Sequence, residues 1–380
     1  MTYLLCGDIG GTNTRLALFD PSSKDPIYSK EYRNINYITD ESKTFERDIF
    51  APFLEEADLV DNEEIVACFA VAGPVRSNCV TLTNLGGHDV SDSKNDQKRI
   101  EVKLDGQSIE QNSSGLLKRI VRCKIINDFV GQGYGLLDLD LDSEVIELLP
   151  GSKELIDPYG PKACVGAGTG LGECFLTTSS LHPEEGYECY ASEGGHVDYA
   201  PRTDVEVGLW NYLKKKFDQQ NRISVERVVS GKGLANCYEY LAIVYPEKVT
   251  EQVHQAFEKA KDMQGQVVGI HANQGTCCLC VQAMDIMMAA YGAECGNASV
   301  KFIPTGGLYV SGGLTPKNIN FIKGADSPFM KAYHDKGRLS GLLDTIPLFA
   351  VLVEDLGMRG ARVCAMREYQ RMKKSNSSRF

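Results

Sequence analysis

Two glycine-rich segments, one in each half of the chain, constrain the fold most strongly. Residues 7–13 (GDIGGTN) and 166–172 (GAGTGLG) each lie between two short apolar runs that are typical of strands. Glycine permits positive φ and removes side chains, so the amide groups of such a turn can point into one concavity that binds phosphate. A plain hairpin is the simpler interpretation of either segment alone. Two such turns with matching flanks indicate a duplicated nucleotide-binding unit.

The apolar patterns around these turns predict an α/β fold. Residues 64–72 form a continuous apolar run, which is typical of a strand buried on both faces. Residues 45–57 carry apolar side chains at helical spacing. Further strands are expected over 3–7, 15–19, 27–33, 123–126 and 308–311, a helix end over 116–121, and helices over 206–217, 233–244, 251–263, 276–288 and 356–372.

Length and charge narrow the class of protein. A chain of 380 residues suggests two domains. Its formal net charge of −11 argues against a nucleic-acid partner, which needs a basic face. A nucleotide ligand is still compatible, because backbone amides and Mg²⁺ can hold its phosphates. No signal peptide and no apolar run of about 18 residues is found, so we expect a cytoplasmic protein without a membrane segment.

The thirteen cysteines are scattered along the chain and, without an export signal, are expected to be reduced thiols. Cys277, Cys278 and Cys280 lie close to His271, which raises the question of a zinc site. Their spacing contains no C-x₂-C pair, and the run that follows resembles a buried helix. We therefore interpret them as core thiols and predict no zinc.

Residues 86–114 are polar, and we interpret them as a surface excursion that is partly mobile.

Asn127 and Asp128 follow a strand-like run, where a carboxylate would point towards the ligand-binding edge of an α/β sheet. A kinase needs a base at such a place to accept a hydroxyl proton. Asp128 is equally suited to cap the next helix, and the dipeptide alone does not separate the two roles. Asp8, at the end of the first strand, can hold Mg²⁺ directly or through water.

Three further segments combine glycine with polar side chains. Glu193 and His196 flank two glycines and are suitable partners for sugar hydroxyls; they are too few for a zinc site. Residues 224–231 predict a short helix with Ser224 as its N-cap, in which Glu226 either complements the helix dipole or accepts a sugar hydroxyl. Gly312 and Gly313 end a strand and indicate either a nucleotide pocket or tight packing.

Taken in order, these motifs resemble the bacterial-type glucokinases of the hexokinase and actin-like ATPase superfamily. The resemblance covers nearly the whole chain and rests on residues 7–13 with Arg15, 127–129, 166–172, 193–198, 224–228 and 311–313. It implies two RNase H-like domains with a cleft between them. The small domain would comprise residues 1–138 and 355–380, with the first phosphate loop and the catalytic Asp. The large domain, 139–354, would hold the second phosphate loop, the sugar-binding Glu and His residues and the adenosine pocket.

The resemblance also implies roles for single residues in the ATP-dependent phosphorylation of glucose at its 6-hydroxyl, the first step of glycolysis. Asp128 would be the general base, and Asp8 would organise the Mg²⁺ of Mg·ATP. The sugar would be bound by Asn127, Glu193, His196 and Glu226. The ATP phosphates would be bound by Asp8, Gly10, Gly11, Thr12, Asn13, Gly168, Thr169, Gly170, Gly312 and Gly313.

Three departures and several alternatives accompany this hypothesis. One is that residues 83–88 lack the aromatic residue that the bacterial enzymes tend to carry there. Residues 86–114 are longer than the corresponding bacterial segment, and the His and three-Cys zinc motif of the related repressor/kinase family is absent. The polar residues do not distinguish glucose from another hexose or an amino sugar, nor ATP from ADP or polyphosphate. A non-catalytic sugar-sensing protein on the same fold is the less favoured alternative, and the sequence is compatible with a homodimer.

Overall fold

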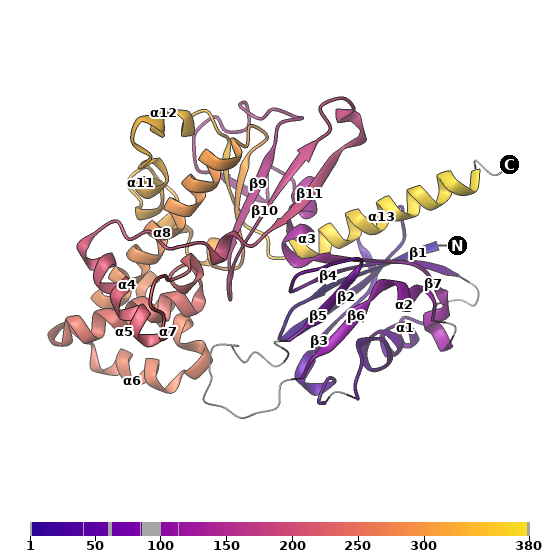
Figure 1. The fold of residues 1–380 in the computed structure, drawn as a ribbon, viewed down its shortest axis with the longest axis horizontal. Coiled ribbons are helices and arrows are strands. Elements are labelled where there is room, and N and C mark those ends of the chain that lie inside the picture. Colours follow the sequence, from indigo (N-terminus) through magenta and orange to yellow (C-terminus); the bar gives the residue numbers. More distant parts are fainter. Residues whose placement is uncertain are drawn as a thin grey trace. The chain divides into compact units, whose positions relative to one another are not determined.

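A computed structural model describes residues 2–377 of the chain except 41, 60–62, 84, 86–99 and 113. The described residues divide into two compact units (Figure 1). Unit 1 comprises Met1–Leu139 with Asp355–Phe380, and unit 2 comprises Asp140–Glu354.

The sheet of unit 1 has the strand order β3-β2-β1-β4-β7. Its strands are β1 (Thr2–Ile9), β2 (Asn13–Phe19), β3 (Pro26–Arg33), β4 (Glu64–Val71) and β7 (Ile120–Asn127). β1, β2 and β3 form an antiparallel meander, whereas β4 pairs in parallel with β1 and β7. The predicted burial of β4 on both faces is confirmed, because Ile65–Val71 are all buried.

Helices cover both faces of this sheet. On one face, the helical segment that begins at Glu46 packs on β4, where the rings of Phe50 and Phe69 stack 4.5 Å apart. On the other face lie α3 (Asp128–Gly135) and the long C-terminal helix α13 (Leu356–Ser377), which pack on each other and on the central strands (Figure 1). Gly360 allows this close crossing, because a Cβ there would overlap the Gly131 carbonyl. Close packing therefore offsets the low helix propensity of the glycine-rich α3.

The sheet of unit 2 repeats the same strand pattern and adds one strand, in the order β11-β10-β9-β12-β13-β8. Its strands are β8 (Val145–Glu147), β9 (Lys162–Ala167), β10 (Leu171–Thr178), β11 (Tyr187–Ser192), β12 (Leu308–Ser311) and β13 (Leu348–Val351). β9, β10 and β11 are antiparallel neighbours, and β12 pairs in parallel with β9 and β13. Both units thus join an antiparallel meander to two parallel strands.

The remaining elements are short or belong to the helical part of unit 2. The other α-helices are α1 (Ala51–Glu56), α2 (Gly106–Glu110), α4 (Asp204–Lys216), α5 (Gly231–Val244), α6 (Glu251–Lys259), α7 (Gln264–Asn273), α8 (Cys278–Phe302), α9 (Leu314–Lys317), α10 (Ile319–Ile322), α11 (Pro328–His334) and α12 (Ser340–Leu343). A two-stranded sheet pairs β5 (Cys79–Leu82) with β6 (Val102–Asp105). The 3-10 turns are Asn34–Asn36, Gly115–Arg119, Leu136–Asp138, Pro183–Glu185, Gly194–His196, Val225–Arg227, Pro246–Lys248, Lys261–Met263 and Gly337–Leu339, and Glu46–Phe50 is a π-helical turn that leads into α1.

The predicted α/β class is confirmed, and several expected elements need correction. The excursion predicted over 86–114 is wrong for 102–110, where β6 and α2 bury Val102, Leu104 and Ile109; residues 86–99 and 113 lie outside the described part. The helix expected over 276–288 extends to Phe302 as α8. The segment 224–231 contains only a 3-10 turn, and Ser224 makes no side-chain cap.

A helix that crosses a membrane must be both long and apolar. Among the described residues, no single helix is both long and apolar enough to do so, and the one pair that passes by length and composition, 261–273 with 278–302, is bent by 105°.

Tyr291 of α8 fixes the ends of two neighbouring strands in unit 2. Its buried hydroxyl oxygen lies 3.0 Å from the carbonyl oxygens of Val165 and Ser311 and accepts a hydrogen bond from the Ala167 amide at 3.2 Å. These three groups belong to the C-terminal ends of β9 and β12.

Replacing Tyr291 by Phe removes the hydrogen bonds between its hydroxyl and these three buried backbone groups, which costs about 1–3 kcal/mol. We expect Tyr291→Phe to lower the midpoint of thermal unfolding by several degrees. Tyr159→Phe, at a side chain that is 56% exposed, is the control and should leave the midpoint nearly unchanged. Equal midpoints for the two variants would contradict this role of Tyr291.

Candidate active site

The first glycine loop connects β1 to β2 in unit 1 and is closed by a hydrogen bond from the Gly10 amide to the Asn13 carbonyl, 2.9 Å long. Gly11 and Thr12 form its tip, and Thr12 is exposed. The two antiparallel strands therefore present a short backbone turn at the edge of the sheet, as the glycine pattern predicts.

Asn34, which the sequence analysis missed, holds this loop from beneath. Its buried side chain donates from Nδ2 to the carbonyl oxygens of Gly10 (2.8 Å) and Gly11 (3.3 Å). Its backbone amide donates to the Thr12 carbonyl (2.8 Å), and the Thr14 hydroxyl donates to its Oδ1 (2.7 Å). The negative ends of three consecutive peptide dipoles are thus directed at Asn34, which makes the loop better suited to an anion than to a cation. No sequence motif marks this residue.

Asp8 lies at the end of β1, opposite Arg15 in the register of β2. Nε of Arg15 lies 3.4 Å from Oε2 of Glu31 and forms an ion pair with it. Burial raises the pKa of the Asp8 carboxyl above its usual range, Arg15 lowers it and Glu31 raises it further. A Cβ at Gly357, in the first turn of α13, would lie 3.2 Å from Cγ of Asp8. A cation beside this carboxylate would favour its ionised form.

Asn127 and Asp128 lie where β7 ends and α3 begins. Asn127 is the N-cap, since its Oδ1 accepts from the amides of Phe129 (2.9 Å) and Val130 (3.3 Å), and its Nδ2 donates to the Gly73 carbonyl at 3.1 Å. The alternative that Asp128 is the cap is wrong, because Asp128 is the first residue of α3. Its Oδ1 accepts from the Phe129 amide at 3.0 Å, and its side chain is partly exposed.

The parallel pairing of β1, β4 and β7 brings these residues to one edge. Ile9 pairs with Val71, and Val71 pairs with Asn127, so the three strands end in one row. Two strand spacings separate β1 from β7, which is about 10 Å. The first glycine loop, Asp8 and Asp128 therefore share the carboxyl edge of one sheet.

The second glycine loop, between β9 and β10 in unit 2, lies at the N-terminus of α5. The Gly168 amide donates to the Gly170 carbonyl (2.8 Å), and the Gly231 amide donates to the Gly168 carbonyl (2.9 Å). Ser230 caps α5 by accepting from the Gly233 amide at 2.9 Å. The exposed tip residue, Thr169, therefore lies close to the positive end of a helix dipole.

Gly312 and Gly313 follow β12, which runs parallel to β9 with Ser311 opposite Gly166. Gly312 has a φ of 81°, and a Cβ there would overlap the backbone of Ala167. The glycine is thus required both by its conformation and by the close approach of β9. The structure brings these two glycines to the edge of the sheet that carries the second glycine loop.

Glu226 lies against the second glycine loop. Its Oε2 accepts a hydrogen bond from the Leu171 amide (2.9 Å), and a Cβ on Gly170 would lie 2.5 Å from the same oxygen. The interpretation of Glu226 as a simple helix-dipole partner is wrong, because its segment is a three-residue 3-10 turn and its carboxylate is bound to the loop.

Glu193 and His196 lie on the turn Gly194–His196 that follows β11. Their side chains are 71% and 58% exposed, with Nε2 of His196 4.0 Å from Oε2 of Glu193. The next residue, Val197, accepts a hydrogen bond from the Val225 amide at 2.9 Å. The two turns that carry Glu193, His196 and Glu226 therefore meet near the start of β10.

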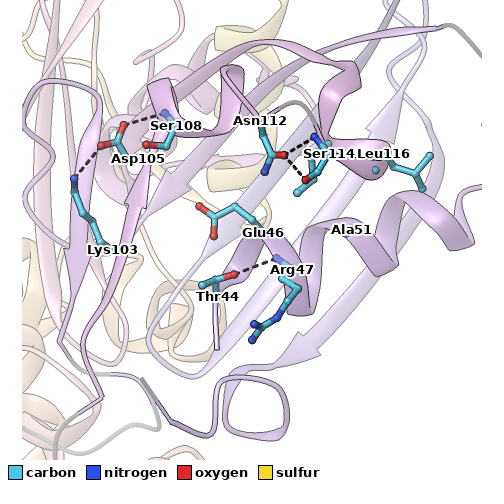
Figure 2. A pocket seen from close by; sticks show the side chains of 12 residues that line it. Thr44, Glu46, Arg47, Ala51, Lys103, Asp105, Ser108, Asn112, Ser114 and Leu116 are labelled. Atoms are coloured by element: carbon cyan, nitrogen blue, oxygen red, sulfur yellow. Dashed lines mark hydrogen bonds and ion pairs between the residues drawn. The ribbon is translucent and has the colours of Figure 1, made fainter. Parts of the chain in front are cut away.

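A separate hollow of about 570 Å³ lies in unit 1. Figure 2 shows Glu46 between the Thr44 and Asn112 side chains, with Asp105 bound to Lys103 at 2.9 Å. Burial raises the pKa of the Glu46 carboxyl. None of the residues predicted to bind sugar or nucleotide lines this hollow.

The cysteine cluster near His271 shows no sign of a metal centre. Cys277 and Cys280 are buried as predicted, whereas Cys278 is exposed, and Nδ1 of His271 is 2.7 Å from the Thr276 hydroxyl. All thirteen cysteines are free thiols. Within the described ranges, no group of three or more His, Cys, Asp or Glu side chains is arranged to hold a metal ion.

Comparison with known proteins confirms the resemblance stated from the motifs. The sequence model named "Glucokinase" matches residues 5–99 and 108–368. A glucokinase from Synechocystis sp. is 38% identical over 95% of this chain and 97% of its own length. A glucokinase from Colwellia psychrerythraea is 30% identical over 94% of each chain.

Solved structures agree with this result. A glucokinase from an Antarctic psychrotroph superposes with a TM-score of 0.71 at 25% identity, covering 96% of this chain and 99% of its own. A ROK family glucokinase from Streptomyces griseus, solved in complex with glucose and AMPPNP, has the same fold with a TM-score of 0.59 at 15% identity, covering 96% and 99%. The family match extends over most of both units, and this chain therefore belongs to the glucokinase family.

Proposed function

We propose that this chain transfers the terminal phosphoryl group of ATP to the 6-hydroxyl of glucose, giving glucose 6-phosphate. The family match and the relatives that bear the name glucokinase support phosphorylation of glucose with ATP. The observation that carries the chemical assignment is the row of strand ends in unit 1, with Asp128 on the same edge as the Gly10–Asn13 turn. A base and a phosphate-binding turn on one edge are what phosphoryl transfer to a hydroxyl requires.

Asp128 is the proposed general base. Its partly exposed carboxylate is held at the start of α3, where Asn127 caps the helix and fixes the backbone that carries the base. One oxygen accepts from the Phe129 amide at 3.0 Å, and this hydrogen bond orients the carboxylate. The carboxylate would accept the proton of the sugar hydroxyl as the phosphoryl group arrives.

Glu193, His196 and Glu226 are the proposed sugar ligands in unit 2, and Asn127 is the proposed sugar ligand in unit 1. The exposure of Glu193 and His196 supports this role, because their polar atoms are available to sugar hydroxyls. Glu226 already uses Oε2 to bind the Leu171 amide, so its other carboxylate oxygen is the proposed sugar acceptor. Glu226 would thereby connect the sugar to the second glycine loop.

The two glycine loops and the Gly312–Gly313 turn are the proposed phosphate and nucleotide contacts. Asn34 directs three carbonyl groups of the first loop towards itself, and the second loop lies at the N-terminus of α5. Both arrangements favour bound anions. The adenosine pocket is assigned to unit 2.

Asp8 is the proposed contact for the Mg²⁺ of Mg·ATP. The described residues provide one half-buried carboxylate at the end of β1 rather than a group of three or more metal ligands, which suits an ion that is shared with substrate phosphates. When bound, Mg²⁺ would neutralise phosphate charge. The role of Asp8 is to position that charge next to the first glycine loop.

The repeated strand pattern supports two RNase H-like domains, as in actin-like ATPases. We assign residues 1–138 and 355–380 to the small domain and 139–354 to the large domain. Free cysteines throughout the chain are typical of a reducing compartment, which supports a cytoplasmic location.

The test of the base is Asp128→Asn, which retains the size of the side chain and removes its basicity. We expect kcat for glucose phosphorylation to fall about 10²–10⁴-fold, with little change in the midpoint of thermal unfolding. The control is Asp326→Asn, at a fully exposed carboxylate, which should keep normal turnover. A near-native kcat for Asp128→Asn would overturn the assignment.

The identity of the sugar is tested by measuring sugar 6-phosphate formation from glucose, fructose, mannose and glucosamine with Mg·ATP. We expect the highest kcat/KM for glucose. A higher value for another sugar would redefine the substrate, and turnover with ADP or polyphosphate but not ATP would redefine the donor.

The role of Asn34 is tested by Asn34→Ala, which removes the side-chain donor to the carbonyls of the first loop. A loss of about 1.4 kcal/mol in loop stabilisation corresponds to roughly a tenfold higher KM for ATP, and we expect a smaller effect on KM for glucose. Asn36→Ala, at an exposed neighbour, is the control. Equal KM values for ATP in the two variants would contradict the role of Asn34.

A further inference from the structure

A buried carboxyl group that the proposed reaction does not use lies directly beneath the turn Gly194–His196. We call this the sugar-binding turn, because Glu193 and His196 are proposed sugar ligands. Glu173 of β10 is only 3% exposed, and its Oε1 has no hydrogen-bond partner in the described part of the chain. Leaving such a polar atom unpaired in the core is costly. The position of Glu173 therefore needs a physical explanation.

A second carboxyl group, from Glu294 of α8, is buried to the same extent beside it. Glu294 has polar partners, since it accepts from Nδ2 of Asn297 at 3.0 Å and lies 3.5 Å from Nζ of Lys301. Burial, followed by the neighbouring Glu294, raises the pKa of Glu173 to about 8. Glu173 therefore retains its proton at neutral pH.

The backbone of the sugar-binding turn rests on this carboxyl group. Ser192 pairs with Glu173 across β10 and β11, and its hydroxyl accepts from the Gly194 amide at 3.0 Å. A Cβ at Gly194 would overlap the Glu173 carboxyl, and a Cβ at Gly195 would overlap the Leu171 carbonyl. The turn therefore has little freedom to move towards β10, and the Glu173 carboxyl sets the distance between the turn and this strand.

We propose that the neutral carboxyl of Glu173 is a positioning group that holds the turn of Glu193 and His196 in the geometry that binds the sugar. This inference rests on the proposed function. Glu193 immediately precedes the glycine that contacts Glu173, and His196 follows two residues later, so a displaced Gly194 displaces both side chains. Ionisation of Glu173 next to Glu294 would place two like charges in the core and push the packing apart.

The other titratable groups around the pair do not replace Glu173 in this role. Cys295 of α8 is a buried thiol whose pKa is raised by burial, and then by Glu173 and Glu294, so it stays neutral. Lys336 donates from Nζ to the Ala293 carbonyl at 3.0 Å, and Lys301 lies next to Glu294. Burial, followed by the charge of Arg202, lowers the pKa of the Lys336 ammonium group.

Three further titratable groups lie on neighbouring elements. Cys164 of β9 contributes a thiol that lies 3.2 Å from the Ser311 hydroxyl. On the turn itself, the side chains of Glu193 and His196 are exposed to solvent. Glu173 is thus the buried acid of this cluster that titrates between neutral and mildly alkaline pH.

The direction of the pH effect follows from proton linkage. An unfolded Glu has a pKa of about 4.3, so the folded state binds the extra proton of Glu173 between that value and about pH 8. The stability that this proton contributes is lost as the pH rises through this window. Above about pH 8, Glu173 of the folded protein is ionised, and the turn no longer packs on a neutral carboxyl group.

The experiment measures KM for glucose between pH 6.5 and 9.5 for the wild type, Glu173→Gln and the exposed control Glu184→Gln. We expect KM to rise about 3- to 10-fold across the window in the wild type and the control, and to stay within about twofold in Glu173→Gln, whose amide mimics the neutral acid. Glu294→Gln removes the neighbouring charge and should shift the rise in KM to lower pH. Thermal unfolding, measured in parallel, should show Glu173→Gln gaining stability relative to the wild type from pH 5 to 8.5.

Each outcome decides one question. A pH-dependent KM that is the same in the wild type and Glu173→Gln would overturn the inference while leaving the proposed function intact. A purely structural role would change the midpoint of unfolding with the same KM profile, and would also overturn it. Absence of glucose phosphorylation by the wild type would overturn the proposed function instead. If Glu173→Gln fails to fold, an unshifted KM profile in Glu294→Gln overturns the inference.

Discussion

The backbone pairing of β4 with β1 on one side and β7 on the other is the constraint on which the organisation of unit 1 depends. Parallel strands end at the same edge, so pairing of Ile9 with Val71 and of Val71 with Asn127 aligns three chain segments that are far apart in sequence. The first glycine loop and Asp128 acquire their common edge from this register. A slip of β4 by one residue would move each of its buried side chains to the opposite face of the sheet and disrupt the packing on both faces.

Parallel strand pairing also aligns strand ends in unit 2, where contacts of other kinds support it. β9 and β12 run in parallel and their ends are joined by the buried hydroxyl of Tyr291, which brings Gly312 next to the second glycine loop. The turns that carry Glu226 and His196 lie against the start of β10, one through a carboxylate and the other through glycine contacts. The polar side chains at this edge are thus placed by backbone groups, whose geometry depends little on side-chain motion.

Sequence reasoning recovered the parts of this arrangement that have a periodic or compositional signal. The apolar run of β4, the two glycine loops and the strand at Leu308–Ser311 each have a local signature, and their order was sufficient to recognise the glucokinase family. Residues whose role arises from long-range contacts were missed. Asn34, Tyr291 and Glu173 occupy positions without a local pattern, and only the folded chain brings them against a loop, two strand ends or a turn. β6 and α2 were missed because their few buried apolar residues lie in a polar stretch.

The C-terminal helix α13 has a consequence for how the chain is made. It covers one face of the sheet of unit 1, where Cys364 lies beside Cys6 and Cys68, although residues 140–354 separate it from the rest of that unit. A ribosome that adds about 5–20 residues per second needs on the order of ten to forty seconds to synthesise this intervening segment. During that time α3 is the helix available to this face, and the part of β1 and β4 that α13 contacts has no partner. Unit 2, which is continuous in sequence, can complete its core first, and the nascent first unit depends on late docking of α13 or on transient protection by a chaperone.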